Sequence, residues 1–158
     1  MDNPRLLCKE SILALDIATK CGYYSLCGSG TWNFWPSRSR NQGHTYQAFY
    51  DTLTAFVKTN GIHQLVVEDL NVNAHFTDLR KLGQLHGVML LVCEQYDLLP
   101  PLYVNVSVLK KWATGNGRAT KDEMIAACVD RYHFHPVDDN EADAFLLFHY
   151  YCRKWRIT

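Results

Sequence analysis

The stretch Ser11 to Asp16 (SILALD) decides the fold of this chain, because it is a short apolar run that ends on a carboxylate. A run of this kind predicts a buried β-strand. Two aromatic stretches follow, Gly22 to Cys27 (GYYSLC) and Thr31 to Trp35 (TWNFW), and they flank Gly28-Ser29-Gly30. Aromatic runs around a glycine turn predict a hairpin, so we expect three consecutive antiparallel strands.

The rest of the chain predicts strands that alternate with helices. Apolar residues recur at helical spacing from Tyr46 to Val57, and Asn60-Gly61 ends that pattern. The expected elements after it are strands at 64–68 (QLVVE) and 102–106, a long helix at 76–96, and helices near 107–113, 121–132 and 140–154. A hairpin followed by strand–helix–strand units predicts an α/β fold. We expect one domain over 1–158, a mixed five-stranded sheet with helices on both faces.

Composition excludes several classes of protein. The chain has 158 residues and is 47% hydrophobic, which argues against disorder. It contains no apolar segment long enough to span a bilayer and no signal peptide in its first ten residues, so we expect a soluble, cytoplasmic protein without membrane contact. The six cysteines are scattered without paired spacing, which indicates reduced thiols rather than a zinc site.

Charge is balanced overall but locally clustered. There are 16 basic and 16 acidic residues, which is unfavourable for a nucleic-acid-binding protein. The basic residues gather, however, in five groups: Arg38/Arg40, Arg80/Lys81, Lys110/Lys111, Arg118/Lys121 and Arg153/Lys154/Arg156.

Acidic residues end two of the predicted strands and begin the last helix. Asp16 and Glu68 each close an apolar strand, where a carboxylate is costly to bury unless it is paired or binds a cation. If the two strands are parallel neighbours, both carboxylates emerge at one edge of the sheet. Asp143 lies in an apolar run of the last helix and shares a helix face with Asp139 or with Asn140. Helix capping is the alternative explanation for Asp138.

Oxygen ligands of this kind favour Mg²⁺ or Mn²⁺ over zinc. Two such ions can activate a water and stabilise the leaving oxygen in phosphodiester cleavage.

Four segments in order resemble RuvC-type Holliday junction resolvases, whose fold is ribonuclease-H-like. The first is LALDIATKCGYYSL, with its acid and the following Gly-aromatic pair. The second is VVEDLNVNAHFTDLRKLGQLHGVML, in which Leu82-Gly83-Gln84 and Gly87-Val88 match. The third and fourth are VLKKWATGNGRATKDEM and NEADAFLL. The resemblance runs over nearly the whole length of the chain.

The resemblance implies catalytic and metal-binding roles. Asp16, Glu68 and Asp143 match three of the family's four metal ligands. The fourth family position falls on Asn140, which cannot act as a base, and Asp139 is the alternative. Lys110 and Lys121 match basic residues expected to face the scissile phosphate. We expect Lys121 to be a catalytic residue together with the acids.

The resemblance also implies contacts with branched DNA. The family's aromatic wedge position falls on Asn71, so nearby Phe76 is either a replacement wedge or the first core residue of its helix. Further DNA-contact candidates are basic residues, Arg38, Arg40, Arg80, Lys81 and Arg118.

The family dimerises near the glycine-containing helix, which implies a homodimer. Gly83 and Gly87, four residues apart, allow close approach, either of a second copy or of the chain's own sheet.

Taken together, these expectations describe an endodeoxyribonuclease of phage or mobile-element type that cuts four-way junctions with two metal ions. Two alternatives stay open: a ribonuclease-H-fold RNA-processing nuclease similar to YqgF, and a catalytically weak junction-binding protein. An actin-like ATPase is excluded because it needs a duplicated domain.

Overall fold

A computed structural model describes residues 7–34 and 42–158 of the chain. Its centre is one five-stranded sheet in the order β3-β2-β1-β4-β5. β1 pairs antiparallel with β2 and β2 with β3, whereas β4 and β5 run parallel to β1. The strands are β1 Ile12–Asp16, β2 Lys20–Ser25, β3 Gly28–Asn33, β4 Gln64–Glu68 and β5 Leu102–Val104.

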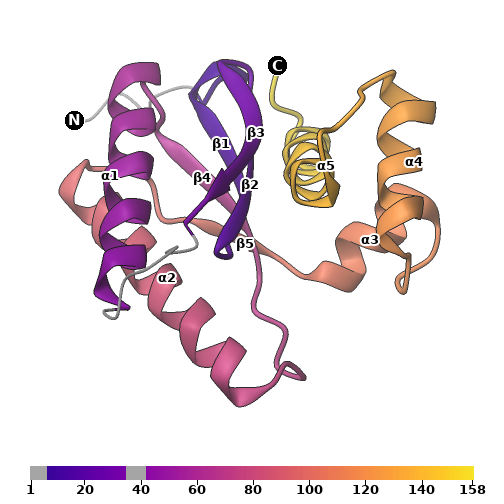
Figure 1. Cartoon of the computed structure of the whole chain (residues 1–158). Helices are drawn as coiled ribbons and strands as arrows, with labels where there is room; N and C mark the ends of the chain where they lie inside the picture. Colours follow the sequence, from indigo (N-terminus) through magenta and orange to yellow (C-terminus); the bar gives the residue numbers. More distant parts are fainter. Residues whose placement is uncertain (1–6, 35–41) are drawn as a thin grey trace.

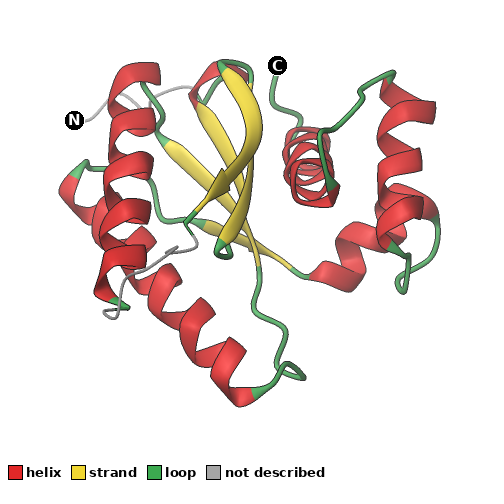
Figure 2. Ribbon diagram, viewed as in Figure 1, coloured by secondary structure: helices red, strands yellow, loops and turns green. Residues whose placement is uncertain are grey.

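Helices cover both faces of this sheet (Figure 1). α1 and α2 lie against one face, and α5 lies against the other, with α3 and α4 beyond it. The helices are α1 Gly43–Asn60, α2 Phe76–Gln95, α3 Val106–Thr114, α4 Lys121–Tyr132 and α5 Asp139–Lys154, and a 3₁₀ turn covers Lys9–Ser11. Figure 2 separates the strands from the two helical layers. The predicted mixed sheet with helices on both faces is therefore confirmed.

Alternation along β1 divides the core into two clusters. Ile12 and Ala14 face α5, while Leu13 and Leu15 face α1 and α2, and all four side chains are fully buried. Successive side chains of a strand point to opposite faces. Asp16 therefore shares the face of Ile12 and Ala14, which is the α5 side of the sheet.

The hairpin turn lies earlier in the chain than Gly28-Ser29-Gly30, where the sequence predicted it. β2 and β3 are joined at Leu26-Cys27, where the Ser25 hydroxyl accepts the Cys27 N–H at 3.0 Å, and Gly28 and Gly30 belong to β3. Gly30 lies opposite Tyr23, and a Cβ on it would be 3.3 Å from the Tyr23 ring. Gly30 thus makes room for an aromatic side chain instead of forming the turn. Trp35, predicted to end this strand, lies outside the described residues.

Two smaller expectations can also be compared with the structure. All six cysteines are free, as predicted. Within the described ranges, no helix combines the length and the apolar character needed to cross a membrane.

Candidate active site at the β1 and β4 strand ends

Two parallel strands bring their terminal carboxylates to one edge of the sheet. β1 and β4 pair from Ile12↔Gln64 to Leu15↔Val67. Asp16 and Glu68 are the next residues on the two strands, so they lie side by side just beyond the last pair. Both are half-buried, on the face that α5 covers. The expectation that these strands are parallel neighbours is correct, and it is what places the two acids together.

The first turn of α5 supplies the other carboxylates. α5 packs on β1 and β2, and the backbone of Asn140 lies directly against Gly22 of β2. Asp143, one turn further along the helix, is half-buried. Its charge is among the causes that raise the pKa of Asp16 and of Glu68, which places it beside both strand ends.

Burial and mutual repulsion make these acids hard to ionise. Burial, reinforced by the charges of Asp143 and Asp139, raises the pKa of Asp16 to about 7. Burial and then the charge of Asp16 raise the pKa of Glu68 to about 9. Burial raises the pKa of Asp143 to about 6, although the charge of Lys110 opposes the change. Carboxylates that repel one another in a partly dehydrated place are poised to accept a cation.

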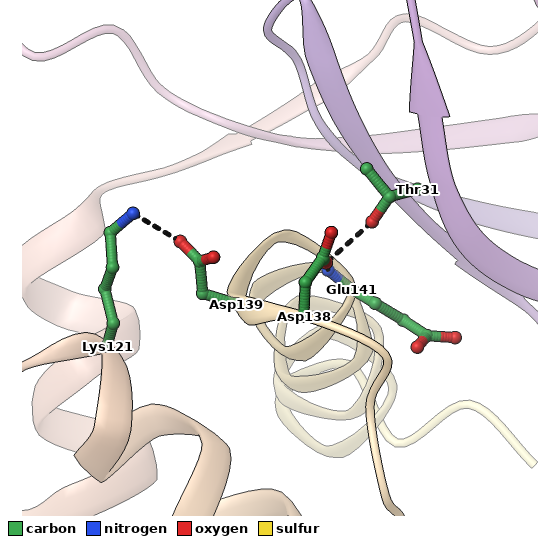
Figure 3. Close-up of polar contacts among 5 residues, drawn as sticks. All are labelled: Thr31, Lys121, Asp138, Asp139 and Glu141. Atoms are coloured by element: carbon green, nitrogen blue, oxygen red, sulfur yellow. Dashed lines mark hydrogen bonds and ion pairs between the residues drawn. The ribbon is translucent and has the colours of Figure 1, made fainter.

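Two lysines border the acids. Lys121, the first residue of α4, has its Nζ atom 2.6 Å from an Asp139 oxygen (Figure 3). Thr120 caps α4 and forms a reciprocal capping box with Glu123. The capping box fixes the start of the helix, and with it the position of Lys121. Lys110 of α3 is half-buried, and its charge lowers the pKa of Glu68 and of Asp143. Both predicted lysines therefore lie near the carboxylates.

The start of α5 separates the roles of three neighbouring residues. Asp138 caps the helix, because its carboxylate accepts the Glu141 N–H at 2.9 Å, as the capping explanation predicted. The Asn140 side chain also hydrogen bonds to Asp138. Asp139 instead pairs with Lys121 and adds to the repulsion on Asp16. Asp139 is thus an acidic residue of this turn whose charge reaches Asp16.

The acids are near one another without forming a finished ligand shell. Among the described residues, no three side chains of Asp, Glu, His or Cys are grouped tightly enough, as they stand, to hold a metal ion. The donor set nevertheless suits a hard cation, because it consists of carboxylate oxygens whose charges repel one another. Small side-chain rotations toward a shared ion would relieve that repulsion.

The candidates for DNA contact differ in how exposed they are. Phe76 begins α2 and is 68% exposed, so the explanation that it is a core residue is wrong. The guanidinium of Arg80 lies 4.6 Å from its ring centre. Asn71 and Arg118 are exposed and Lys81 is half-buried. Arg38 and Arg40 lie outside the described residues.

The glycines of α2 do not pack on the chain's own sheet. Gly83 and Gly87 are both exposed, and a Cβ on either would meet nothing within 4 Å. The alternative of close approach to the sheet is therefore wrong. Leu90 and Leu91 on the same helix are also exposed, at 46% and 50%.

One contact at the site carries no local sequence signal. In the sequence, Gly22 is part of a predicted strand and of the Gly-aromatic pair, and Thr31 is part of the predicted hairpin. In the structure Gly22 contacts the backbone of Asn140, and the Thr31 hydroxyl donates to Asp138 at 2.7 Å (Figure 3). Only the strand register, together with the position of α5, reveals them.

A mixed sheet of this order, with carboxylates from β1, β4 and α5 at one edge, defines a ribonuclease-H-like fold. Solved structures of Holliday junction resolvases share this fold. Thermus thermophilus RuvC superposes with a TM-score of 0.71 over 92% of this chain and 96% of its own, at 14% identity. The same protein in complex with Holliday junction substrate gives 0.72, over 91% and 95% of the two chains, also at 14% identity. The yeast mitochondrial Holliday junction resolvase gives 0.62 over 96% and 87%, at 10% identity.

Sequence similarity points the same way over a shorter span. The chain is 32% identical over 101 residues to the crossover junction endodeoxyribonuclease RuvC of two strains of Desulfitobacterium hafniense. That alignment covers 62% of this chain and 60% of the relatives' own length. No protein-family model matches the chain. The chain is thus RuvC-like in fold and, over those 101 residues, in sequence.

Proposed function

We propose that this protein is a metal-dependent, structure-specific endodeoxyribonuclease that cuts branched DNA such as four-way junctions. One observation carries the proposal: in a RuvC-type fold, carboxylates from three separate elements lie at a single edge of the sheet, where burial raises the pKa of each and the charge of Asp143 adds to the rise at Asp16 and Glu68. The likeness to RuvC, one of whose structures holds Holliday junction substrate, supports the choice of substrate.

Mg²⁺ or Mn²⁺, in two copies, is the proposed cofactor. Asp16, Glu68 and Asp143 would hold it, and Asp139 would complete the set. When bound, such ions lower the pKa of a water molecule and stabilise the leaving oxygen of a phosphodiester.

The protein's own residues would bind and orient the DNA strand. Lys110 and Lys121 bring positive charge to the carboxylate edge, where a phosphate would otherwise be repelled by the acids. The Lys121 ammonium pairs with an Asp139 carboxylate oxygen, so a phosphate would compete for it with that carboxylate. Asn71 and Arg118, together with Arg80 and Lys81 of α2, would contact the DNA away from the cut.

Phe76 is the proposed wedge between bases. Its ring is exposed at the start of α2, beside the guanidinium of Arg80. An apolar ring inserted into a base step unstacks it, and an adjacent cation can contact the backbone there.

A homodimer would match the two-fold symmetry of a junction cut on two strands. The exposed face of α2 with Gly83, Gly87, Leu90 and Leu91 is the proposed interface, because it offers apolar side chains beside glycines that admit a close neighbour. The whole chain would act as one nuclease domain on DNA in the cytoplasm.

The test is cleavage of a synthetic four-way junction by the purified chain, with Mg²⁺, with Mn²⁺ and with EDTA. We expect paired nicks only when a divalent ion is present. Linear duplex and an RNA hairpin are the control substrates, and preferential cutting of the RNA would favour the RNA-processing alternative. Tight junction binding without cleavage in either metal would favour a junction-binding protein, for which Asn140 at the fourth position is the supporting feature.

A further inference from the structure

A row of three residues crosses the sheet at the level of Asp16. Asp16 pairs with Gly22 on β2, and Gly22 pairs with Thr31 on β3. Side chains at directly opposite positions of antiparallel strands point to the same face. Because Asp16 faces α5, the Thr31 side chain faces α5 as well, and so would any side chain at Gly22.

The first turn of α5 rests on this row at two points. A Cβ on Gly22 would lie 1.9 Å from the Asn140 carbonyl oxygen and 2.3 Å from its carbon, so the helix touches the strand backbone itself. The Thr31 hydroxyl donates to an Asp138 carboxylate oxygen at 2.7 Å, and the same oxygen accepts the Glu141 N–H at 2.9 Å. One carboxylate oxygen therefore joins the edge strand to the helix (Figure 3).

The buried Glu141 side chain binds the backbone of the segment that precedes α5. The Glu141 side chain is 4% exposed, and its carboxylate accepts the Val137 N–H at 2.6 Å. The segment that leads into α5 is thus tied to the helix, and the helix is tied to the sheet through Thr31. Asp139 begins this helix and Asp143 follows one turn later, so the position of the helix sets where both acids lie.

We propose that Gly22 and Thr31 are positioning residues, which set where the acids of α5 lie relative to Asp16 and so set the affinity for a divalent cation. This inference rests on the proposed function. A Cβ at Gly22 would push the helix outward by roughly 1.5 Å to reach an ordinary carbon–oxygen contact of about 3.3 Å. Metal–ligand distances tolerate only about 0.2 Å, so even part of that displacement matters.

Thr31→Val and Gly22→Ala test this role, with Mn²⁺ alone as the probe. Thr31→Val keeps the shape of the side chain and removes the hydrogen bond, while Thr31→Ser restores the hydroxyl. Ser29→Ala, on the same strand and face two residues away, is the matched control. Residues that orient ligands typically change metal affinity about 10–100-fold, so we expect a Kd for Mn²⁺ raised about tenfold by Thr31→Val and about 100-fold by Gly22→Ala.

Amide hydrogen exchange at Glu141 gives a second readout that does not depend on activity. We expect Thr31→Val to speed exchange there, and Thr31→Ser and Ser29→Ala to match the original chain in both exchange and Mn²⁺ affinity. If Thr31→Val leaves both unchanged, or if Thr31→Ser fails to restore them, the positioning role is wrong, even when Gly22→Ala is too unstable to measure. If the unaltered chain neither binds Mn²⁺ nor cuts a junction, the proposed function fails, and this role fails with it.

Discussion

Replacing Asp16 by Asn should make the protein more stable in EDTA while it abolishes cleavage. Asp16 ends β1 beside other acids, and burial together with their charges raises its pKa to about 7 in the folded state. In the unfolded chain its pKa returns to about 3.8. Between these values the unfolded state binds fewer protons, so the free energy of unfolding falls as pH rises through this window. Asn carries no charge and avoids that loss.

The size of the effect follows from the same change in pKa. Three pKa units correspond to about 4 kcal/mol, which is an upper bound. Asp16 is only half-buried, so solvent screening reduces this to about 1–2 kcal/mol above pH 7. For a chain of this length each kcal/mol moves Tm by about 2–4 °C, so we expect a rise of about 2–8 °C.

Thermal unfolding at pH 4 and at pH 8, with EDTA and with excess Mg²⁺, measures this effect. The stabilisation by Asp16→Asn should appear at pH 8 and vanish at pH 4. Mg²⁺ should raise the Tm of the unaltered chain and leave the variant unchanged, because bound ligand stabilises by mass action. Asp51→Asn removes one exposed charge from α1, on the opposite face of the sheet, and serves as the control. A variant that is less stable than the parent at pH 8 in EDTA would refute this reasoning.

Three further predictions concern separate parts of the structure. Lys121→Ala should slow junction cutting by about 10–100-fold and weaken junction binding much less, since one exposed phosphate contact adds little to affinity; equal losses in kcat and in Kd would make Lys121 a simple DNA contact. His149 lies among Tyr132, Phe145 and Phe148, and burial lowers its pKa to about 4. The free energy of unfolding should therefore fall as pH falls from about 6.5 to 4. His149→Phe should make that fall smaller by about 1–2 kcal/mol, as measured by urea unfolding at pH 6.5 and at pH 4. Leu91→Glu should leave the chain folded but monomeric, measured by sedimentation, and an unchanged oligomeric state would exclude the α2 interface.

Local patterns were sufficient to predict the elements. Helical periodicity and Asn60-Gly61 predicted the end of α1, where Gly61 adopts a left-handed φ of 61°. The stretches 64–68 and 121–132 were predicted with the bounds that β4 and α4 have. The hairpin turn was misplaced because glycine is a turn signal, whereas here Gly30 accommodates the ring of Tyr23.

By itself, the sequence determined which acids stand at strand ends and at the start of a helix, because hydrophobic periodicity is a local property. Only the tertiary structure decided that Asp139 pairs with Lys121 and lies near Asp16, and that Phe76 is exposed. The place of Asp139 depends on how closely α5 approaches β2, where Gly22 leaves room for the backbone of Asn140, more than a hundred residues away along the chain. A contact between such distant segments leaves no periodic trace in either one.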